Sequence, residues 1–366
     1  MVIDMKQLLK NLSINGEILD ILCKDGKIEK IGRIDGEGID FGGKRVFAGL
    51  VDIHTHGMGG IDTMDAELDK LSLLYANAGT TTVYPTTMTA PREDIVKVLT
   101  APVSEKGAKI AGIHLEGPYI SEKYKGAQNA DFIRLPDINE FREYDRAAIV
   151  TIAPELSGAT EYIKNTDMLV CIGHTAADYD TAVKAADAGA KCVTHTFNAM
   201  PPLHHRMPSV LGAAFDKDMY IQVICDGKHI HPSVIRVLYK LFGSDRMVLI
   251  SDSMRAAGLP DGKYEFGGQE MTVTDGIART PDGALAGSTS TLFDCVKCAI
   301  DFGIPERDAF KMASETPAEM LGLNCGKIAE GYDCDLAVLD GSGNIDTVII
   351  NGEIVKGDIK NEFDFM

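Results

Sequence analysis

Two histidines one residue apart are the first side chains in the chain that could do chemistry. The segment Phe47–His56 reads FAGLVDIHTH, and a glycine-rich turn follows it. Residues i and i+2 of a strand point to the same side, so His54 and His56 would converge at the strand's end. Paired imidazoles suit Zn, Fe, Ni or Cu better than Mg or Ca. Taken alone, the pair fits either a metal site or two polar residues at a strand exit.

Further ligand-type side chains follow later apolar runs, at Glu116, His174, His195 and Asp252. Imidazoles from separate strands can hold one or two divalent ions, and the two oxygens of Glu116 could bridge them. Such an ion lowers the pKa of its bound water towards about 7, so hydroxide becomes available as a nucleophile at neutral pH. Asp252 could accept a proton from that water and deliver it to a leaving amine. His114 shares a face with Glu116, and we expect it to be a buried neighbour rather than a ligand.

The segments that must position these residues alternate between strand and helix patterns. Strand-like apolar runs occur at Val46–Ile53, Thr81–Pro85, Ile110–Leu115, Ala148–Ala153, Met168–Ile172, Cys192–Thr196, Tyr220–Cys225 and Met247–Ile250. Helical patterns between them include Pro91–Leu99 and Ala177–Ala186. Eight such units predict a TIM (β/α)8 barrel, in which the chemistry lies at the carboxyl ends of the strands. A doubly wound sheet is the alternative, but no strand is followed by a GxGxxG or GxxxxGK[ST] phosphate loop.

Both ends of the chain have a different pattern, with short alternating runs punctuated by glycine. Asp25-Gly26 near the start and Asn351-Gly352 near the end are hairpin signals. Neither end has enough strands to form a core alone. We therefore expect residues 1–47 and 325–366 to join into one small β-sandwich domain, with the barrel at 48–324 inserted between them.

Composition limits the class of partner. The chain has 366 residues and a formal net charge of −18, which argues against nucleic acid because phosphate backbones attract basic surfaces. No segment is apolar enough to span a membrane, and the N-terminus lacks a signal-peptide pattern, so we expect a cytoplasmic protein. Three of the eight cysteines, Cys171, Cys192 and Cys225, lie in apolar runs and are expected to be reduced and buried. Cys295 and Cys298 form a lone CxxC on a helical pattern, which favours packing over redox or metal chemistry.

The surrounding motifs resemble the N-acetylglucosamine-6-phosphate deacetylases of the amidohydrolase superfamily. The matching stretches read GLVDIHTHG from Gly49, PTTMT from Pro85, GIHLEGPY from Gly112, APE from Ala153, GHTA from Gly173, THTFNAM from Thr194, DGKH from Asp226, SDSMRAAGLPDG from Ser251 and LAGS from Leu285. They run in order through nearly the whole chain. The resemblance implies hydrolysis of N-acetylglucosamine 6-phosphate to glucosamine 6-phosphate and acetate.

The resemblance also implies a role for each matching position. Glu116, His174 and His195 would hold the metal common to the family, and His54 and His56 a second ion that only some members bind. The cofactor would thus be one or two divalent ions per chain, zinc or iron, with Asp252 as general base and acid. Substrate contacts would come from Ala127, Gln128, Asn198, Ala199 and His229, and from Arg206 of a neighbouring subunit in a homodimer. Spacing alone would leave Arg206 as a solvated loop residue or a phosphate ligand, and His229 as a turn residue.

One departure from the family pattern concerns Gln128, where many members carry a histidine that polarises the acetamide carbonyl. Glutamine can donate a hydrogen bond but cannot become cationic. We therefore hypothesise that the second ion, held by His54 and His56, takes over this task. Three other functions stay open: a deacetylase for N-acetylgalactosamine 6-phosphate, a cyclic-amide hydrolase such as a dihydroorotase, and a catalytically inactive scaffold. The retained ligand set argues against the scaffold, and Ala153-Pro-Glu155 on the fourth strand offers no lysine for a dihydroorotase centre.

Overall fold

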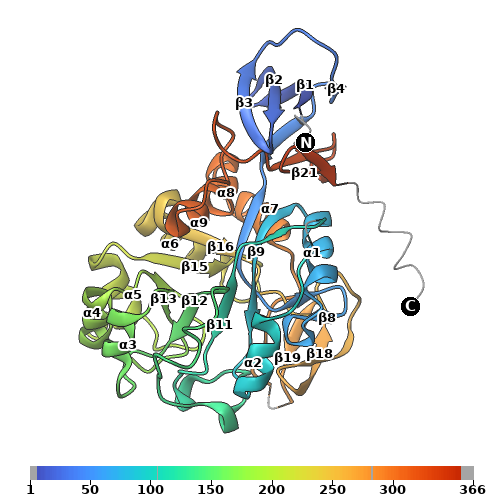
Figure 1. Ribbon diagram of the computed structural model, residues 1–366. Helices are drawn as coiled ribbons and strands as arrows, with labels where there is room; N and C mark the ends of the chain where they lie inside the picture. Colours follow the sequence, from blue (N-terminus) through green and yellow to red (C-terminus); the bar gives the residue numbers. More distant parts are fainter. Residues whose placement is uncertain (1–5, 105, 282, 356–366) are drawn as a thin grey trace.

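The structure, a computed structural model, describes residues 6–104, 106–281 and 283–355. Its centre is a nearly closed barrel of eight parallel strands with helices outside, and a second sheet lies beyond one end (Figure 1). In spatial order the barrel strands are β6 (Leu50–Thr55), β9 (Thr80–Thr87), β11 (Ile113–Glu116), β12 (Ala147–Ile152), β13 (Leu169–Ile172), β14 (Cys192–Val193), β15 (Tyr220–Ile224) and β16 (Met247–Ile250). The short β10 (Lys109–Ile110) also pairs with β9. The predicted TIM barrel is therefore confirmed.

The first and last barrel strands meet without a regular ladder. The backbone N–H of Asp252, just after β16, donates to the carbonyl of His54 in β6 at 2.9 Å. Beside it the Ser251 N–H donates to the Asp52 carboxylate at 3.4 Å. All residues of β6, β9 and β16 are buried, as expected for parallel strands covered on both faces. The closure thus places His54 and Asp252 next to each other.

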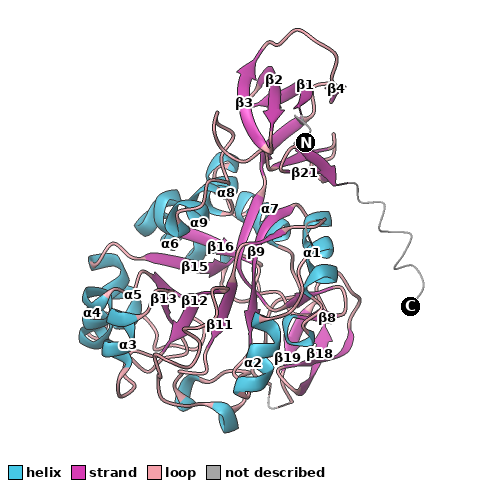
Figure 2. Ribbon diagram, viewed as in Figure 1, coloured by secondary structure: helices cyan, strands magenta, loops and turns pink. Residues whose placement is uncertain are grey.

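Helices surround the barrel and supply its outer layer (Figure 2). They are α1 (Leu68–Asn77), α2 (Arg92–Leu99), α3 (Ala159–Asn165), α4 (Tyr179–Ala188), α5 (Ser209–Asp216), α6 (Pro232–Arg246), α7 (Leu292–Asp301), α8 (Glu306–Met312) and α9 (Glu315–Leu321), with 3-10 turns at Thr63–Asp65, Glu122–Tyr124 and Ala130–Phe132. Helix α4 begins after Asp178, whose side chain accepts the Thr181 N–H. The helices predicted around Pro91–Leu99 and Ala177–Ala186 correspond to α2 and α4. None of the helices in the described ranges is long and apolar enough to cross a membrane.

The second sheet contains strands from both ends of the chain. Its members are β1 (Lys6–Ile14), β2 (Glu17–Lys24), β3 (Lys27–Gly32), β4 (Ile39–Asp40), β5 (Arg45–Ala48), β20 (Leu336–Leu339), β21 (Ile345–Ile350) and β22 (Glu353–Val355). Strand β20 pairs with β5, with Val338 opposite Val46, and both side chains join one apolar core. The predicted union of the two ends is confirmed. The boundaries at 47/48 and 324/325 stay predictions, and residues 1–5 and 356–366 of that domain lie outside the described residues.

A disulfide within this sheet was not expected from the sequence. Cys23 of β2 is bonded to Cys334, 311 residues later and just before β20. The expectation of buried packing does hold for the free thiols of Cys171, Cys192 and Cys225. The bond follows from the union of the two ends, because the segment before β20 reaches the turn between β2 and β3, where the Cys334 N–H donates to the Gly26 carbonyl at 2.8 Å.

A small antiparallel sheet after the barrel was also missed. It consists of β17 (Gly262–Phe266), β18 (Gln269–Thr274) and β19 (Ile277–Arg279), beside a short hairpin of β7 (Gly57–Met58) and β8 (Ile61–Asp62). The pairs Gly267-Gly268 and Asp275-Gly276 between alternating segments were readable hairpin signals. The Phe266 ring packs edge-on against His56, with ring centroids 5.1 Å apart. This sheet therefore covers one side of the barrel mouth.

Candidate active site

The predicted ligand-type residues meet at the carboxyl ends of the barrel strands. They are His54 and His56 at the end of β6, Glu116 ending β11, His174 after β13, His195 after β14 and Asp252 after β16. His174, His195 and Asp252 have backbone φ angles of 45°, 22° and 45°. Left-handed backbone is unfavourable for residues with a Cβ and occurs often at functional sites. Here it turns three side chains inward directly after their strands.

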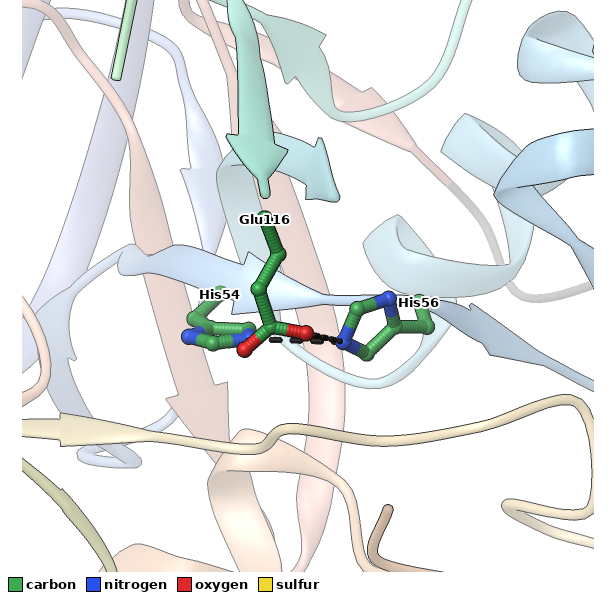
Figure 3. Close-up of side chains that lie close together, drawn as sticks. All are labelled: His54, His56 and Glu116. Carbon is green, nitrogen blue, oxygen red and sulfur yellow. Dashed lines mark hydrogen bonds and ion pairs between the residues drawn. The ribbon is translucent and has the colours of Figure 1, made fainter. Parts of the chain in front are cut away.

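The Glu116 carboxylate lies at the centre of four imidazoles. Its Oε1 is 3.2 Å from His174 Nε2, 3.0 Å from His195 Nε2 and 3.2 Å from His54 Nε2. Its Oε2 is 3.3 Å from His56 Nε2. Figure 3 shows Glu116 descending from β11 between His54 and His56. One carboxylate thus faces two pairs of imidazoles, as a bridging ligand would.

Two imidazoles are fixed in orientation by backbone carbonyls behind them. His56 Nδ1 lies 3.1 Å from the Thr86 carbonyl, and His174 Nδ1 lies 2.9 Å from the Tyr124 carbonyl. A carbonyl oxygen can only accept, so both rings carry a proton on Nδ1. In each neutral ring Nε2 then carries a lone pair that faces a Glu116 oxygen. Because two lone pairs repel each other, such a contact is stable only with a proton or a cation between the two atoms. Metal-ligating histidines usually donate their other ring N–H to a fixed acceptor in the same way.

The donor set fits a divalent metal. His54, His56 and Glu116 form one group with ligand atoms within 4.8 Å of one another, and Glu116, His174 and His195 form a second. All five residues are buried. Imidazole and carboxylate ligands suit zinc or iron, and metal binding displaces protons from such ligands. The electrostatics agree: burial lowers the pKa of His56, but Asp252 and Glu116 outweigh it and raise that pKa to about 10. The site therefore favours positive charge strongly, as a proton or as an ion.

Asp252 faces the same two imidazoles, His54 and His56, as Glu116 does. Its Oδ1 is 3.5 Å from His54 Nε2 and 3.3 Å from His56 Nε2. Burial would raise the pKa of Asp252, but the imidazoles of His54 and His56 outweigh it and hold the pKa below its usual value. The carboxylate is thus ionised at neutral pH and free to accept a proton.

His114 is a buried neighbour, as expected, and not part of the ligand set. Its Nδ1 donates to the Ile53 carbonyl at 2.9 Å, and its Nε2 lies 2.8 Å from Thr151 Oγ1. Burial holds the pKa of His114 well below its usual value, so the ring is neutral. It packs under His54 at a centroid distance of 4.6 Å. His114 therefore supports the strand that carries His54.

A cavity of about 290 Å³ opens beside Glu116 and Asp252. Among its lining residues are five of the predicted substrate contacts, namely Ala127, Gln128, Asn198, Ala199 and His229. Arg206 is not among them and is exposed on a loop. The described lining contains no lysine or arginine. Histidines are therefore the side chains of the described lining that can carry a positive charge.

Gln128 is committed to the ligand carboxylate. Its Nε2 donates to Glu116 Oε2 at 2.5 Å, and its Oε1 accepts the Thr89 N–H at 2.6 Å. The backbone N–H fixes which end of the amide faces Glu116, since it must meet an acceptor. Gln128 therefore orients Glu116 and is not free to polarise a carbonyl in the cavity.

His229 places a positive charge in the cavity wall. Its Nδ1 lies 2.8 Å from Asp226 Oδ2, and its Nε2 lies 3.0 Å from the Ala286 carbonyl. Both partners accept, so both nitrogens carry protons and the ring is an imidazolium. Burial lowers the pKa of His229, but the Asp226 carboxylate outweighs it and raises the pKa. The surrounding structure thus holds a positive charge against the cavity wall.

The amidohydrolase family matches residues 45–355 of the sequence. The chain belongs to this family. It is 36% identical over 356 residues to an N-acetylglucosamine-6-phosphate deacetylase of Vibrio furnissii, covering 91% of this chain and 89% of that protein. It is 35% identical over 325 residues to an N-acetylgalactosamine-6-phosphate deacetylase of Escherichia coli O157:H7, covering 83% and 86%. The solved N-acetylglucosamine-6-phosphate deacetylase of Thermotoga maritima aligns with a TM-score of 0.87 at 32% identity, covering 96% of this chain and 99% of that one.

Some residues at this amidohydrolase site were not found from the sequence. Phe266 reaches His56 from the missed sheet of β17, β18 and β19. Gln222, in the middle of β15, contacts His54 from inside the barrel. Its signal was weak but present, because it is the polar residue in the otherwise apolar stretch YIQVIC.

Proposed function

We propose that the chain deacetylates N-acetylglucosamine 6-phosphate to glucosamine 6-phosphate and acetate. The observation that carries the proposal is the buried Glu116 carboxylate facing four imidazoles, with Asp252 ionised opposite it at the edge of a cavity. The chain's similarity to deacetylases of phosphorylated amino sugars supports the choice of substrate. We place the reaction in the cytoplasm, where a phosphorylated sugar would be retained.

The cofactor we propose is zinc or iron, one or two ions per chain. Glu116, His174 and His195 would hold one ion, and His54, His56 and Glu116 the other. When bound, such ions supply a nucleophilic water of lowered pKa and a Lewis acid for the amide carbonyl. The ligands themselves are oriented by hydrogen bonds within the chain. Gln128 holds Glu116, and the carbonyls of Thr86 and Tyr124 hold His56 and His174.

Asp252 would manage the proton of the reaction. Its ionised oxygen faces the same imidazoles as Glu116, so it can accept a proton from the attacking water at Oδ1. The same group can then deliver that proton to the amine nitrogen as the amide bond breaks. Asn198, the backbone at Ala199 and the His229 imidazolium also line the cavity, where they would hold the sugar and its phosphate. His229 would do so through its charge, because both its N–H groups already face Asp226 and Ala286.

The hydrogen bonds of the Gln128 amide are an argument for a second metal ion in each chain. Because Gln128 is bonded to Glu116 and Thr89, polarisation of the acetamide must come from elsewhere. We propose that the ion held by His54 and His56 supplies it. Replacing both histidines by asparagine should then remove one ion per chain and nearly all turnover. Full activity with one ion per chain would contradict this assignment.

The experiment that tests the function is a set of rates on metal-quantified protein, purified without oxygen. N-acetylglucosamine 6-phosphate, N-acetylgalactosamine 6-phosphate and unphosphorylated N-acetylglucosamine are compared under identical conditions. We expect the first to be fastest and the third to be poor. A higher rate on the galactosamine compound, which is the substrate named for the Escherichia coli relative, would reassign the sugar. No hydrolysis of any of the three would favour the cyclic-amide or scaffold alternatives.

A further inference from the structure

Gln222 occupies the floor of the proposed metal centre. It lies in β15 with its side chain directed into the barrel and is completely buried. Its Oε1 is 2.9 Å from His54 Nδ1 and accepts the backbone N–H of His195 at 3.4 Å. Its Nε2 lies 3.6 Å from Cys171 Sγ. One amide thus touches a residue from each of the two ligand groups.

The backbone of His195 decides which way round this amide lies. A backbone N–H can only donate, so the Gln222 atom facing it must be the oxygen. That oxygen also faces His54 Nδ1, which must therefore carry the proton. The neutral His54 ring then has its lone pair on Nε2, the atom 3.2 Å from Glu116 Oε1. The tautomer of a ligand histidine is set here by a chain of fixed donors and acceptors.

His54 differs from the other proposed ligand histidines because a side chain, and not the backbone, contacts its Nδ1. His56 and His174 are oriented by backbone carbonyls, which no substitution removes. His195 Nδ1 is buried without a hydrogen-bond partner in the described parts of the chain. Gln222 is thus the side chain that orients His54 and, through the same oxygen, the backbone at His195.

We propose that Gln222 is a positioning residue that fixes the His54 proton on Nδ1 and couples the two halves of the metal centre. The inference deepens the proposed function, because it assigns how the chain prepares the second ion's ligand. Loss of an outer hydrogen bond to a metal-ligating histidine typically costs about 10–100-fold in metal affinity. Gln222→Leu should show this loss at the ion held by His54 and His56, while Gln222→Glu, which keeps an acceptor, should restore much of it.

The test measures zinc binding and the His54 ring directly, without reference to turnover. Zinc affinity is determined by chelator competition for the wild type, Gln222→Leu, Gln222→Glu and the control Thr151→Val. Thr151 is equally buried, and its side chain hydrogen-bonds His114 and Thr194 but no proposed ligand; its backbone, which pairs with Glu116, is unchanged in Thr151→Val. In parallel, nitrogen-15 spectra of histidine-labelled, zinc-loaded protein show which nitrogen of His54 carries its proton.

The expected result is a protected Nδ1–H on His54 in the wild type, and selective weakening of one ion in Gln222→Leu but not in Thr151→Val. A His54 protonated on Nε2 in the wild type would overturn the proposal even if Gln222→Leu does not fold. Equal zinc affinity in wild type and a folded Gln222→Leu would overturn it as well. If the zinc-binding results are as expected but the protein does not deacetylate the sugar, the proposed function is wrong and the role of Gln222 still holds.

Discussion

Asp252 is the residue on which the proposed chemistry depends most directly. Replacing it by asparagine keeps its size but removes the proton acceptor. We expect turnover to fall by about 10²–10⁴-fold, the usual contribution of general acid–base catalysis, with little change in substrate affinity. Single-turnover rates and substrate binding measured on metal-matched preparations check this. Near wild-type turnover in Asp252→Asn would remove the residue from its assigned role.

The charge of His229 should make the KM for the phosphorylated sugar depend on pH. Its pKa is raised by Asp226, so the imidazolium persists above the ordinary histidine pKa and is lost as the pH rises through the raised value. Its contribution to folding is likewise complete at low pH and disappears on the alkaline side. We expect the KM for the phosphorylated sugar to rise over that alkaline range.

The matched measurement uses His229→Gln, which keeps a hydrogen-bond donor but has no charge to lose. Its KM should be higher at neutral pH and nearly flat across the same range. A wild-type KM that does not change with alkaline pH would show that the His229 charge does not contact the phosphate.

At the residue scale, the candidate site residues could be picked from the sequence because each stands at or just after the end of an apolar run. His54, Glu116 and Asp252 were found in this way, and the structure brings them together. The contact of Gln222 with His54 and the bond between Gln128 and Glu116 could not be predicted. They depend on which side chains of different strands meet inside the barrel, and hydrophobic periodicity carries no information about that.

At the scale of elements, the spacing between neighbouring strands sets the positions of the ligands. Gly173 lies just before His174, and a Cβ there would be 2.6 Å from Thr194 Cβ and 2.8 Å from Thr151 Cγ2. Both neighbours are β-branched and stiff, so the strands would have to separate. We expect Gly173→Ala to cost about 1–3 kcal/mol of stability and to weaken metal binding by displacing His174.

Denaturant unfolding and zinc titration of Gly173→Ala check this expectation. The control is Gly341→Ala, at a position where a Cβ would meet nothing within 4 Å. A Gly173→Ala protein as stable as the control, with unchanged zinc affinity, would show that the strands tolerate the extra methyl group.

The elements of the barrel were predictable because each parallel strand is a short, almost wholly apolar run. Each of the eight predicted runs overlaps a barrel strand. The sheet of β17, β18 and β19 was missed because it interrupts the strand–helix alternation after the barrel is complete. Its burial pattern alternates, as in β18, and this identifies a sheet with one solvated face.

At the scale of the whole molecule, no lysine or arginine of the described chain lines the cavity that would hold the substrate's phosphate. We propose that Arg206 of a second copy completes the site, since the loop that carries it is exposed and includes the exposed Leu203 and Met207. Arg206→Ala and Asp252→Asn homodimers should each be poorly active. Mixed and re-assembled, they should regain activity, because hybrid dimers contain one site with both native residues.

Sizing by light scattering and the activity of the mixture check this arrangement together. A monomer with full activity, or a mixture no more active than its components, would show that each subunit works alone. The spacing of residues in one chain cannot predict such a contact, because a loop arginine that reaches a neighbouring site has the same sequence signature as a solvated surface arginine.

The union of both chain ends in one sheet also has a consequence for synthesis on the ribosome. Strand β5 is synthesised early, but its partner β20 is synthesised only after all the barrel strands. Val46 therefore lacks its partner Val338 for most of synthesis. Until then β5 presents an unpaired edge, which is a template for pairing with other chains. The barrel in between can form from local βα units, whereas this pairing is among the most distant in the chain and must form late. A nascent chain that stalls before residue 336 would therefore hold a complete set of barrel strands and an exposed, aggregation-prone edge.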